Sequence, residues 1–493
     1  MLYGNQDNVR EALQRGEYDD ASLTAWGRLD DLMALAEGLG VLKELNGIHP
    51  ELTREGSIPR WFIHRALLLR TVVGDESLNA MQEGLFQDVG VLRLLGCTAR
   101  EIREGFDPTR NRGQHTPCHV DSVRDRLKQT PVAQFYEVFT RCRARWIKAG
   151  FIKRRGTSML DATKLEVDGE YEGAGEMTVI EETVDAQGKL HRRKVVTKGF
   201  TLVTLSYLVP KSRLLVVLAY RVLPIQQHEV TVSDELIEEV LAAVGEGAIR
   251  LLLLDRGFLD GERLGRWHGR QMDVMVPVKH NMAVLADMQG LAQLPTDEHI
   301  VPAARRGVKD AQGQPLDDVR LLGFHDLETL ESYPGRLNGL LVTAFRGREL
   351  SPEDQWGAIT TLPMRTPTAV LAAFDAYDDR SLVENTEYRE LKQGYRLPTF
   401  IGKDASAIAG HIFFEVLLYS VIALYQQERA SRDVAEGIRR WRRVVWKERL
   451  EVVVYVGCWY GRCRVREFAT LLGRPPTGRL DATRVQLRPG RRP

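Results

Sequence analysis

The residues AIRLLLLDRGFLDGERLGRWHGRQMDVMVPVKH (248–280) decide which fold this sequence predicts. The run AIRLLLL is apolar almost throughout, as expected of a fully buried strand, and it ends in charge at Asp255. DGERLGRWHGRQ predicts a helix, and MDVMVPVKH predicts a second buried strand. The stretch therefore indicates a strand, a helix and a strand within an α/β domain.

The sequence before this stretch adds three strands and a helix. The segments SMLDATKLEV (158–167), GFTLVTLSYLVP (199–210) and RLLVVLAYRVLP (213–224) are rich in residues that favour strands. SDELIEEVLAAVG (233–245) predicts a helix with Ser233 as its N-cap and Gly245 as its stop. Three strands, a helix, a strand, a helix and a strand predict a mixed α/β sheet.

Three further regions flank the predicted sheet. Residues 1–150 show apolar residues at helical spacing and predict a helical domain. Residues 281–365 contain short strand-like runs among Gly, Pro and charged residues, which predicts a β-rich insert. Helices resume after the insert, and residues 426–493 predict basic helices followed by a disordered basic tail. The predicted domains are therefore 1–150, 151–425 and 426–493.

The charge is unevenly distributed although the net charge of the 493 residues is only +1. From Arg429 to the end there are 17 Lys and Arg against 6 Asp and Glu, and from Arg100 to Arg155 there are 14 against 6. Basic blocks separated by acidic ones suggest a polyanionic partner that is held at defined places. Two solvated helical faces are about as plausible from charge alone.

The composition also bears on the compartment. Five cysteines, an odd number, are scattered along the chain, which argues for a reducing cytoplasm and against a disulfide framework. The start has no basic and apolar segments typical of a signal peptide. The most apolar stretch, residues 412–425, is short, and Glu415 lies within it. We therefore predict a buried core helix there, a cytoplasmic protein and no contact with a membrane.

Two aspartates lie at strands of the predicted sheet. Asp161 is inside the apolar run MLDAT, where a charged residue is costly unless it is paired or binds a metal ion. Asp255 follows LLLL at the carboxyl end of a second strand, where open α/β sheets form their ligand crevices. The alternative for each is a turn or a helix cap.

A third carboxylate lies in the helical segment after the insert. In YDDRSLVENTEYRELKQG, Tyr377, Arg380 and Glu384 are spaced by three and four residues and share one helical face. An exposed Arg-to-Glu pair is the alternative, but Leu382 and Val383 are apolar neighbours. Three carboxylates from two strands and a facing helix suit two Mg²⁺ ions about 3.5–4 Å apart, the arrangement used for phosphoryl transfer.

The order Asp, Asp in DRGF, Tyr-x2-Arg-x3-Glu and a downstream Lys resembles the DDE transposases of bacterial insertion sequences. The resemblance is to the cut-and-paste subgroup with a β-strand insert between the second Asp and the Glu, and it covers residues 45–425. It implies an RNase H-like catalytic domain and an N-terminal domain that binds the DNA ends. It also implies that Asp161, Asp255 and Glu384 are catalytic ligands of two Mg²⁺ or Mn²⁺ ions.

The same resemblance implies a set of DNA contacts. Tyr377 and Arg380 would contact phosphates of the element end. The family's Lys usually follows the Glu with six residues between them, whereas here seven precede Lys392 and Leu391 stands at the expected place. QWGAITTLP matches the family's Trp-x3-Thr-x2-Pro strand, so Trp356 would stack on a flipped base, with packing inside the insert as the alternative.

Two further basic residues lie at ends of predicted strands. Lys279 ends the strand after Asp255, where the family often places basic residues against DNA; a solvated strand end is about as plausible. Arg256 follows Asp255 directly and is expected to pair with DNA or with a carboxylate.

The resemblance implies cleavage of a DNA strand at the element end, attack of the freed 3′-OH on the opposite strand, and later strand transfer to a target. Cutting both ends together implies a homodimer on DNA. The alternatives are an inactive or domesticated DNA-binding derivative, which would bind without cutting, and an RNase H-like nuclease that cuts without rejoining.

Overall fold

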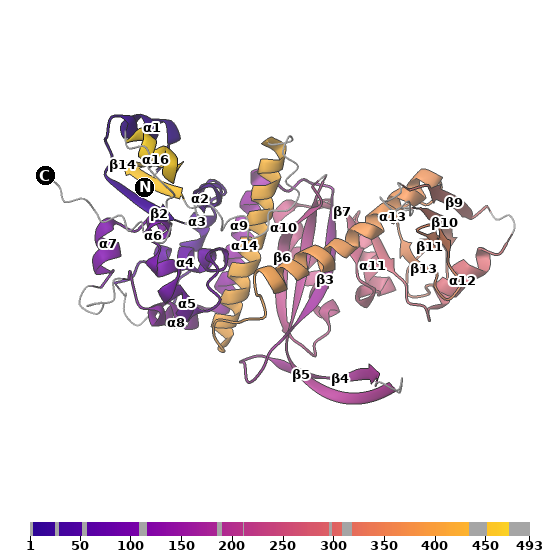
Figure 1. Ribbon diagram of the computed structural model, residues 1–493. Helices are drawn as coiled ribbons and strands as arrows, with labels where there is room; N and C mark the ends of the chain where they lie inside the picture. Colours follow the sequence, from indigo (N-terminus) through magenta and orange to yellow (C-terminus); the bar gives the residue numbers. More distant parts are fainter. Residues whose placement is uncertain are drawn as a thin grey trace. The chain divides into compact units, whose positions relative to one another are not determined.

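The computed structural model describes residues 3–24, 29–51, 57–107, 116–184, 190–210, 212–294, 298–307, 318–432 and 451–472. The chain divides into two compact units (Figure 1). One unit joins Met1–Arg145 with Leu391–Pro493, and the other is Trp146–Glu390.

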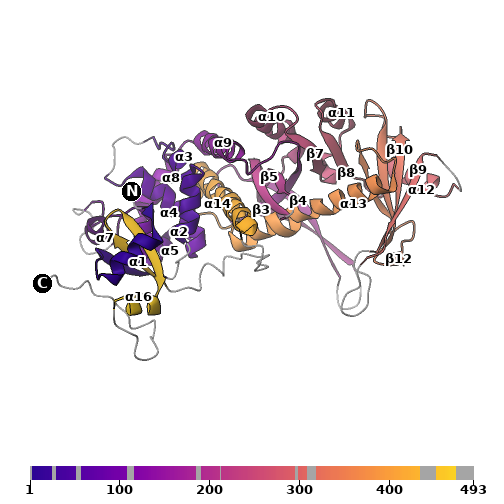
Figure 2. The same ribbon diagram turned by 90° about the horizontal axis from the view of Figure 1, so that it is seen from above.

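The central unit contains the predicted mixed sheet. Its elements follow in the predicted order: β3 (Gly156–Glu166), β5 (Leu190–Val209), β6 (Leu214–Pro224), α10 (Ser233–Val244), β7 (Ile249–Leu254), α11 (Gly261–Gly269) and β8 (Asp273–Pro277). These strands lie side by side in the order β6-β5-β3-β7-β8. Helices α10 and α11 cover one face of the sheet, and α13 (Pro367–Leu382) runs along the other (Figure 2). The prediction of a mixed α/β sheet is confirmed.

The register of three strands positions the first two aspartates. β3 pairs in parallel with β7, with Leu160 beside Leu254, so the residues that follow them, Asp161 and Asp255, come at the same level of the sheet. On its other side β3 pairs antiparallel with β5, and Asp161 lies opposite Thr204. The two carboxylates therefore belong to neighbouring strands.

The β-rich insert is part of the same sheet. After α12 (Ala283–Leu291), its strands continue outward from β8 in the order β13-β11-β10-β9. All these pairings are antiparallel, and Ala358 of β13 lies opposite Pro277 of β8. The strands are β9 (Ile300–Arg305), β10 (Val319–Leu327), β11 (Leu337–Phe345), β12 (Arg348–Glu349) and β13 (Trp356–Thr360). Continuous pairing joins the insert firmly to the strands that carry the aspartates.

A hairpin at the edge of the central sheet lies outside the predicted strands. β4 (Gly175–Val184) forms a long hairpin with the first half of β5 and lies at one edge of the sheet (Figure 1). Ile180 and Val196 of this hairpin are 57% and 59% exposed. None of the side chains described in residues 176–180 and 192–198 is buried, so this part of the sequence lacks the alternation of apolar and polar residues that identifies a half-buried strand.

The helix expected to carry Glu384 changes its winding. Thr366 caps α13, with its side chain accepting from the Ala369 N–H, and Pro367 follows in the first turn. The chain then continues as two π-helical stretches, η4 (Val383–Tyr388) and η5 (Glu390–Gly394). Such wide turns are rare in proteins, and those that occur often lie at functional sites. Glu384 lies in the first of them.

The other unit is built mainly of helices. Up to residue 148 these are α1 (Gln6–Gln14), α2 (Leu29–Gly38), α3 (Val41–Leu45), α4 (Arg60–Val73), α5 (Leu78–Glu83), η1 (Leu85–Gln87), α6 (Val89–Leu95), α7 (Ala99–Glu104), α8 (Val120–Lys128) and α9 (Val132–Lys148). The long α14 (Ala405–Arg432) packs against α2, α4 and α8. This corrects the predicted boundary at residue 425, because the apolar faces of these helices cover α14 and so join it to the N-terminal region.

The apolar helix α14 is long enough to span a membrane by length and composition, but 94% of its most apolar window is buried inside the protein. Its one acidic residue in this stretch, Glu415, forms an ion pair with Arg70 and accepts a hydrogen bond from Thr71. Arg70 Nη2 also lies 3.1 Å from His411 Nδ1. A buried carboxylate needs such partners, and they explain how Glu415 is accommodated in a core helix.

The two ends of the chain form one small sheet, which corrects the all-helical prediction for both. Its order is β1-β15-β14-β2, from Tyr3–Gly4, Trp459–Arg464, Glu451–Val456 and Asp20–Thr24. Val9 and Leu13 of α1 pack on Val452 and Val454 of β14. Pairing between segments more than 400 residues apart is not visible in local periodicity, so EVVVYV was assigned to a helix. The predicted helix over 433–450 and the predicted tail from 473 lie outside the described residues.

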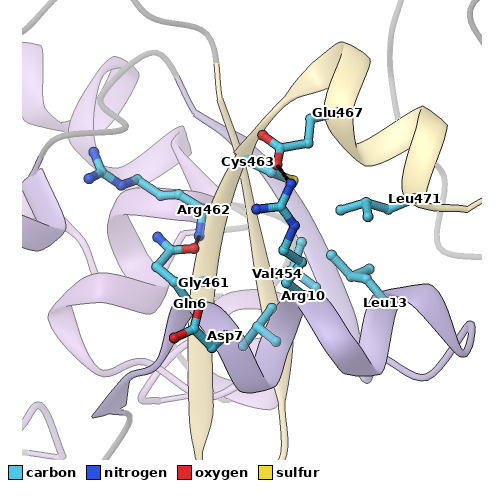
Figure 3. Close-up of a pocket in the computed structure, with 11 residues that line it drawn as sticks. Gln6, Asp7, Arg10, Leu13, Val454, Gly461, Arg462, Cys463, Glu467 and Leu471 are labelled. Atoms are coloured by element: carbon cyan, nitrogen blue, oxygen red, sulfur yellow. Dashed lines mark hydrogen bonds and ion pairs between the residues drawn. The ribbon is translucent and has the colours of Figure 1, made fainter.

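A pocket in this terminal sheet is lined by residues of α1, β14, β15 and α16 (Val465–Leu471) (Figure 3). Arg10 and Glu467 form an ion pair of 3.1 Å there, and the Arg462 N–H donates to Gln6 Oε1. The pocket contains none of the residues predicted for the functional site.

Candidate active site

The three predicted carboxylates come from three separate elements of the central unit. Asp161 is in β3, Asp255 follows the last residue of β7, and Glu384 is in η4. Asp161 is buried, Asp255 is half-buried and the Glu384 side chain is 56% exposed. The set therefore extends from the core of the sheet towards solvent.

The guanidinium of Arg380 joins the three carboxylates. Its Nη1 atom lies 3.2 Å from Asp255 Oδ1 and 3.2 Å from Glu384 Oε1. The same atom lies 3.9 Å from Asp161 Oδ2. Carboxylates that are 94, 129 and 223 residues apart in the chain thus converge on one nitrogen atom. The structure brings together Asp161, Asp255, Arg380 and Glu384.

The cluster concentrates negative charge in a poorly solvated place. Burial, together with the nearby Asp255 and Glu384, raises the pKa of Asp161 to about 7, against a backbone hydrogen bond from Ala162 and the charge of Arg380, which lower it. Burial works against the charge of Arg380, but Asp255, Glu384 and Asp161 raise its pKa overall. A metal ion bound here would favour the ionised form of Asp161.

The donors present fit hard divalent cations. All three side chains offer carboxylate oxygens, which Mg²⁺ and Mn²⁺ prefer. Asp161 Oδ2 is buried and has no hydrogen-bond partner, although Arg380 lies within ion-pair distance. A buried oxygen without a partner is costly, and coordination of a cation would satisfy it. Asp161, Asp255 and Glu384 are therefore suitable ligands.

Tyr377 and Trp356 form a second feature beside the carboxylates. Their rings are stacked, with centroids 4.9 Å apart and an angle of 27°. Trp356 also approaches Phe374 of α13 and Phe345 of β11 at 6.1 Å and 6.4 Å. Because the ring of Trp356 contacts α13, packing inside the insert alone does not describe its position. Both aromatic side chains are half-buried.

The remaining predicted DNA contacts are more dispersed. Arg256 is exposed at the start of η3 (Arg256–Phe258), directly after Asp255. Lys279 is exposed just after β8. Lys392 lies in η5, in the part of the chain that belongs to the other unit. Within the described residues, the structure brings neither Arg256 nor Lys279 into ion-pair contact with the three carboxylates.

A buried polar group behind Asp161 was missed by the sequence reasoning. Thr204, which lies opposite Asp161, donates to Glu387 Oε1 at 2.8 Å and lies 2.9 Å from the hydroxyl oxygen of Tyr388. Glu387 is completely buried, and burial raises its pKa to about 7. A glutamate three residues after Glu384 resembles an ordinary surface residue in sequence, so nothing indicated its burial.

Glu229 is a further carboxylate that the sequence did not single out. It begins η2 (Glu229–Val232), and a Cβ placed on Gly257 would lie 2.6 Å from Glu229 Oε1 and 3.8 Å from Asp255 Oδ2. The space around Gly257 is therefore filled by two carboxylates. A side chain at position 257 would have to displace the end of the Glu229 side chain, which Gly257 leaves in place.

Comparisons with known proteins give a single distant likeness to report. No family model matches the chain, and no curated protein matches it. Among solved structures, the chain is similar to a piggyBac transposase in a synaptic complex with hairpin DNA, at 10% sequence identity and a TM-score of 0.38. The similarity covers 87% of this chain and 81% of that chain.

Proposed function

We propose that this chain is a DDE-type transposase of the insertion-sequence kind, which cuts and rejoins the DNA ends of its own mobile element. The observation that carries the proposal is the convergence of Asp161, Asp255 and Glu384 on Arg380. The sequence motif specifies these residues in order, and the fold brings their side chains to one place.

The topology supports the same proposal. We take β6-β5-β3-β7-β8 as the RNase H-like core that the resemblance implies, with the aspartates on its two adjacent central strands. The strands of the insert lie between β8 and α13 in the chain, so they separate the second Asp from the Glu as the resemblance requires. Rigid strands and a packed helix hold catalytic groups more precisely than loops do.

Asp161, Asp255 and Glu384 would hold two Mg²⁺ or Mn²⁺ ions. In phosphoryl transfer such ions activate the attacking oxygen and stabilise the leaving oxygen. The protein itself contributes mainly positioning and charge neutralisation. Arg380 is the residue that links DNA to the carboxylates, because a phosphate offers its guanidinium a bidentate partner in place of Asp255 and Glu384.

The stacked pair Trp356 and Tyr377 would form an aromatic platform for a base next to the cleavage site. Arg256, Lys279 and Lys392 would contact phosphates. The partner is DNA, and coordinated cutting of two ends requires two copies of the chain on that DNA. Water first cleaves one strand, and the freed 3′-OH then attacks the opposite strand and forms a hairpin. A second water opens the hairpin and regenerates the 3′-OH, which then attacks the target strand.

The test is excision in cells of a marked DNA segment bounded by the gene's own flanking sequence. Wild type is compared with Glu384→Gln, which keeps the size of the side chain but removes its charge. Asp378→Asn is the matched control, because Asp378 is an exposed carboxylate of α13 that pairs with Arg213 instead. The proposal expects excision by wild type and the control, and none by Glu384→Gln. Equal excision by all three would reject this site.

If none of the three excises the segment, purified protein is tested on the same flanks. Binding without cleavage would favour an inactive DNA-binding derivative, and cleavage without strand transfer would favour a nuclease.

A further inference from the structure

A second group of metal-binding side chains lies in the insert. His299, just before β9, and His325 and Asp326 of β10 offer ligand atoms that all lie within 4.8 Å of one another. The rings of the two histidines are 4.9 Å apart. Within the described residues these three side chains form a compact set of two imidazoles and one carboxylate.

The backbone at Asp326 is specialised for this arrangement. Asp326 has φ of +65°, which is uncommon for a residue other than glycine, and the register of β10 with β11 shifts between Phe324 and Leu327. Bulges of this kind re-aim side chains and are frequent next to functional sites. Here the bulge directs the carboxylate of Asp326 to His325, whose Nδ1 is 2.8 Å from Asp326 Oδ2.

Both ring nitrogens of His325 face hydrogen-bond acceptors. Its Nε2 lies 2.9 Å from the Glu298 carbonyl oxygen, and its Nδ1 faces the Asp326 carboxylate. Both neighbours are acceptors, but a neutral imidazole carries only one N–H. If Nε2 donates to the carbonyl, the lone pair of Nδ1 faces a carboxylate. A metal ion bound to that lone pair would also lie beside the Asp326 carboxylate.

We propose that His299, His325 and Asp326 bind a divalent transition-metal ion of the Zn²⁺ class. Two imidazoles and a carboxylate are ligands that Zn²⁺ commonly takes. The carbonyl of Glu298 fixes the ring of His325 as the outer partners of metal-ligating histidines usually do. Arg365 lies 3.4 Å from Asp326 Oδ2, but its side chain is 68% exposed and is free to turn towards solvent.

The ion would link His299, just before β9, to His325 and Asp326 at the bulge of β10. β9 is the last strand of the sheet order, so its start is held on one side only. A site at this position stabilises the outer strands of the insert. It is separate from the three carboxylates and does not depend on the proposed function.

The test is Co²⁺ binding to the full chain after removal of metals, followed by visible absorption. A large excess of Mg²⁺ is present so that carboxylate-only sites are occupied. Wild type is expected to bind one Co²⁺ with the absorption of a nitrogen-ligated, four-coordinate ion, and Zn²⁺ is expected to displace it. His299→Ala is expected to abolish that absorption.

His268→Ala is the matched control, because His268 also lies near one carboxylate, Asp273 at 3.8 Å, but outside the cluster. His299 is the most informative position, since its side chain is 46% exposed and its loss leaves the core intact. Circular dichroism checks that each variant is folded. Absence of a Co²⁺ band in wild type, or an unchanged band in folded His299→Ala, would overturn the proposal.

Discussion

The two clusters of metal-binding side chains in the central unit differ in chemistry and in setting. The first has three carboxylates around Arg380, from two central strands and a π-helical turn. The second has two histidines and one aspartate at the outer strands of the insert. Oxygen-only donors suit Mg²⁺ and Mn²⁺, whereas imidazoles suit Zn²⁺ and related ions.

This difference shows how one sheet separates two tasks. In the carboxylate cluster, the cation that bridges the carboxylates is the guanidinium of Arg380. A DNA phosphate can attract this guanidinium away from the carboxylates, so the cluster is suited to reversible assembly with substrate. In the histidine cluster, two imidazoles and one carboxylate lie close enough together to share one ion. The first site is expected to be catalytic and the second structural.

Removing one carboxylate of the first cluster should have the largest effect. Asp255→Asn should lower DNA strand cleavage by at least on the order of 10²-fold, because charge stabilisation at the reacting phosphate is usually a dominant contribution. The measurement is nicking of a plasmid that carries the gene's flanking sequences. His325→Ala should retain cleavage within a few-fold, and loss of cleavage in both variants would remove the distinction between the clusters.

Replacing Arg380, whose guanidinium bridges the three carboxylates, should strengthen metal binding at the first cluster. Without DNA, Arg380→Gln should bind Mn²⁺ about tenfold more tightly than wild type, which corresponds to about 1.4 kcal/mol. The reason is that Arg380 competes with the ion for the same oxygens. Calorimetric titration measures the affinity.

Arg213→Gln is the control for the loss of a positive charge, because Arg213 pairs with Asp378 and Asp379 of α13 instead. An affinity that is unchanged or weaker in Arg380→Gln would mean that the arginine organises the carboxylates and does not compete with metal.

Zinc should stabilise the protein through the second cluster only. At a free Zn²⁺ concentration about ten times its dissociation constant, binding contributes about 1.4 kcal/mol, or a few degrees in Tm. Thermal unfolding of wild type should show this shift and His299→Ala should not. A shift that persists in His299→Ala but disappears in Asp255→Asn would assign Zn²⁺ to the carboxylates.

The buried Glu387 should make the free energy of unfolding depend on pH. Because burial raises its pKa to about 7 from an ordinary value near 4.5, the folded state keeps its proton to higher pH than the unfolded state does. Its contribution to stability is full below about pH 4.5 and is lost as the pH rises through about 7.

Glu387→Gln removes this titration and should gain about 2.5 kcal/mol relative to wild type between pH 5 and pH 8. Urea unfolding at both pH values measures the difference. Asp161 titrates in the same range in both proteins, so it largely cancels in the comparison. Equal pH dependence of the two proteins would show that Glu387 is ionised in the fold.

The central sheet was predictable because its strands are continuous apolar runs. The apolar runs in LLLLD and MLDAT predict buried strands, and the aspartates stand out because they interrupt these runs. The sheet and its two carboxylates therefore follow from local sequence. The terminal sheet did not follow, because Asp20–Thr24 finds its partner only at Glu451–Val456. Its strands are short, and their pairing depends on contacts across the whole chain.

Within the candidate site, residue identity was more predictable than residue contacts. Helical spacing placed Tyr377, Arg380 and Glu384 on one face and left an Arg-to-Glu pair as an alternative, but it did not predict the contacts of Arg380 with Asp161 and Asp255. The stacking of Trp356 on Tyr377 depends on how the insert meets α13. The π-helical winding after Leu382 and the bulge at Asp326 are local backbone features that no residue pattern predicted.

The most direct test of the account is anomalous diffraction from crystals of the protein with Mn²⁺. The account predicts Mn²⁺ in contact with the carboxylate oxygens of Asp161, Asp255 and Glu384, with the guanidinium of Arg380 displaced from between them. Crystals in which Arg380 still bridges the three carboxylates at saturating Mn²⁺, with no anomalous signal there, would contradict it.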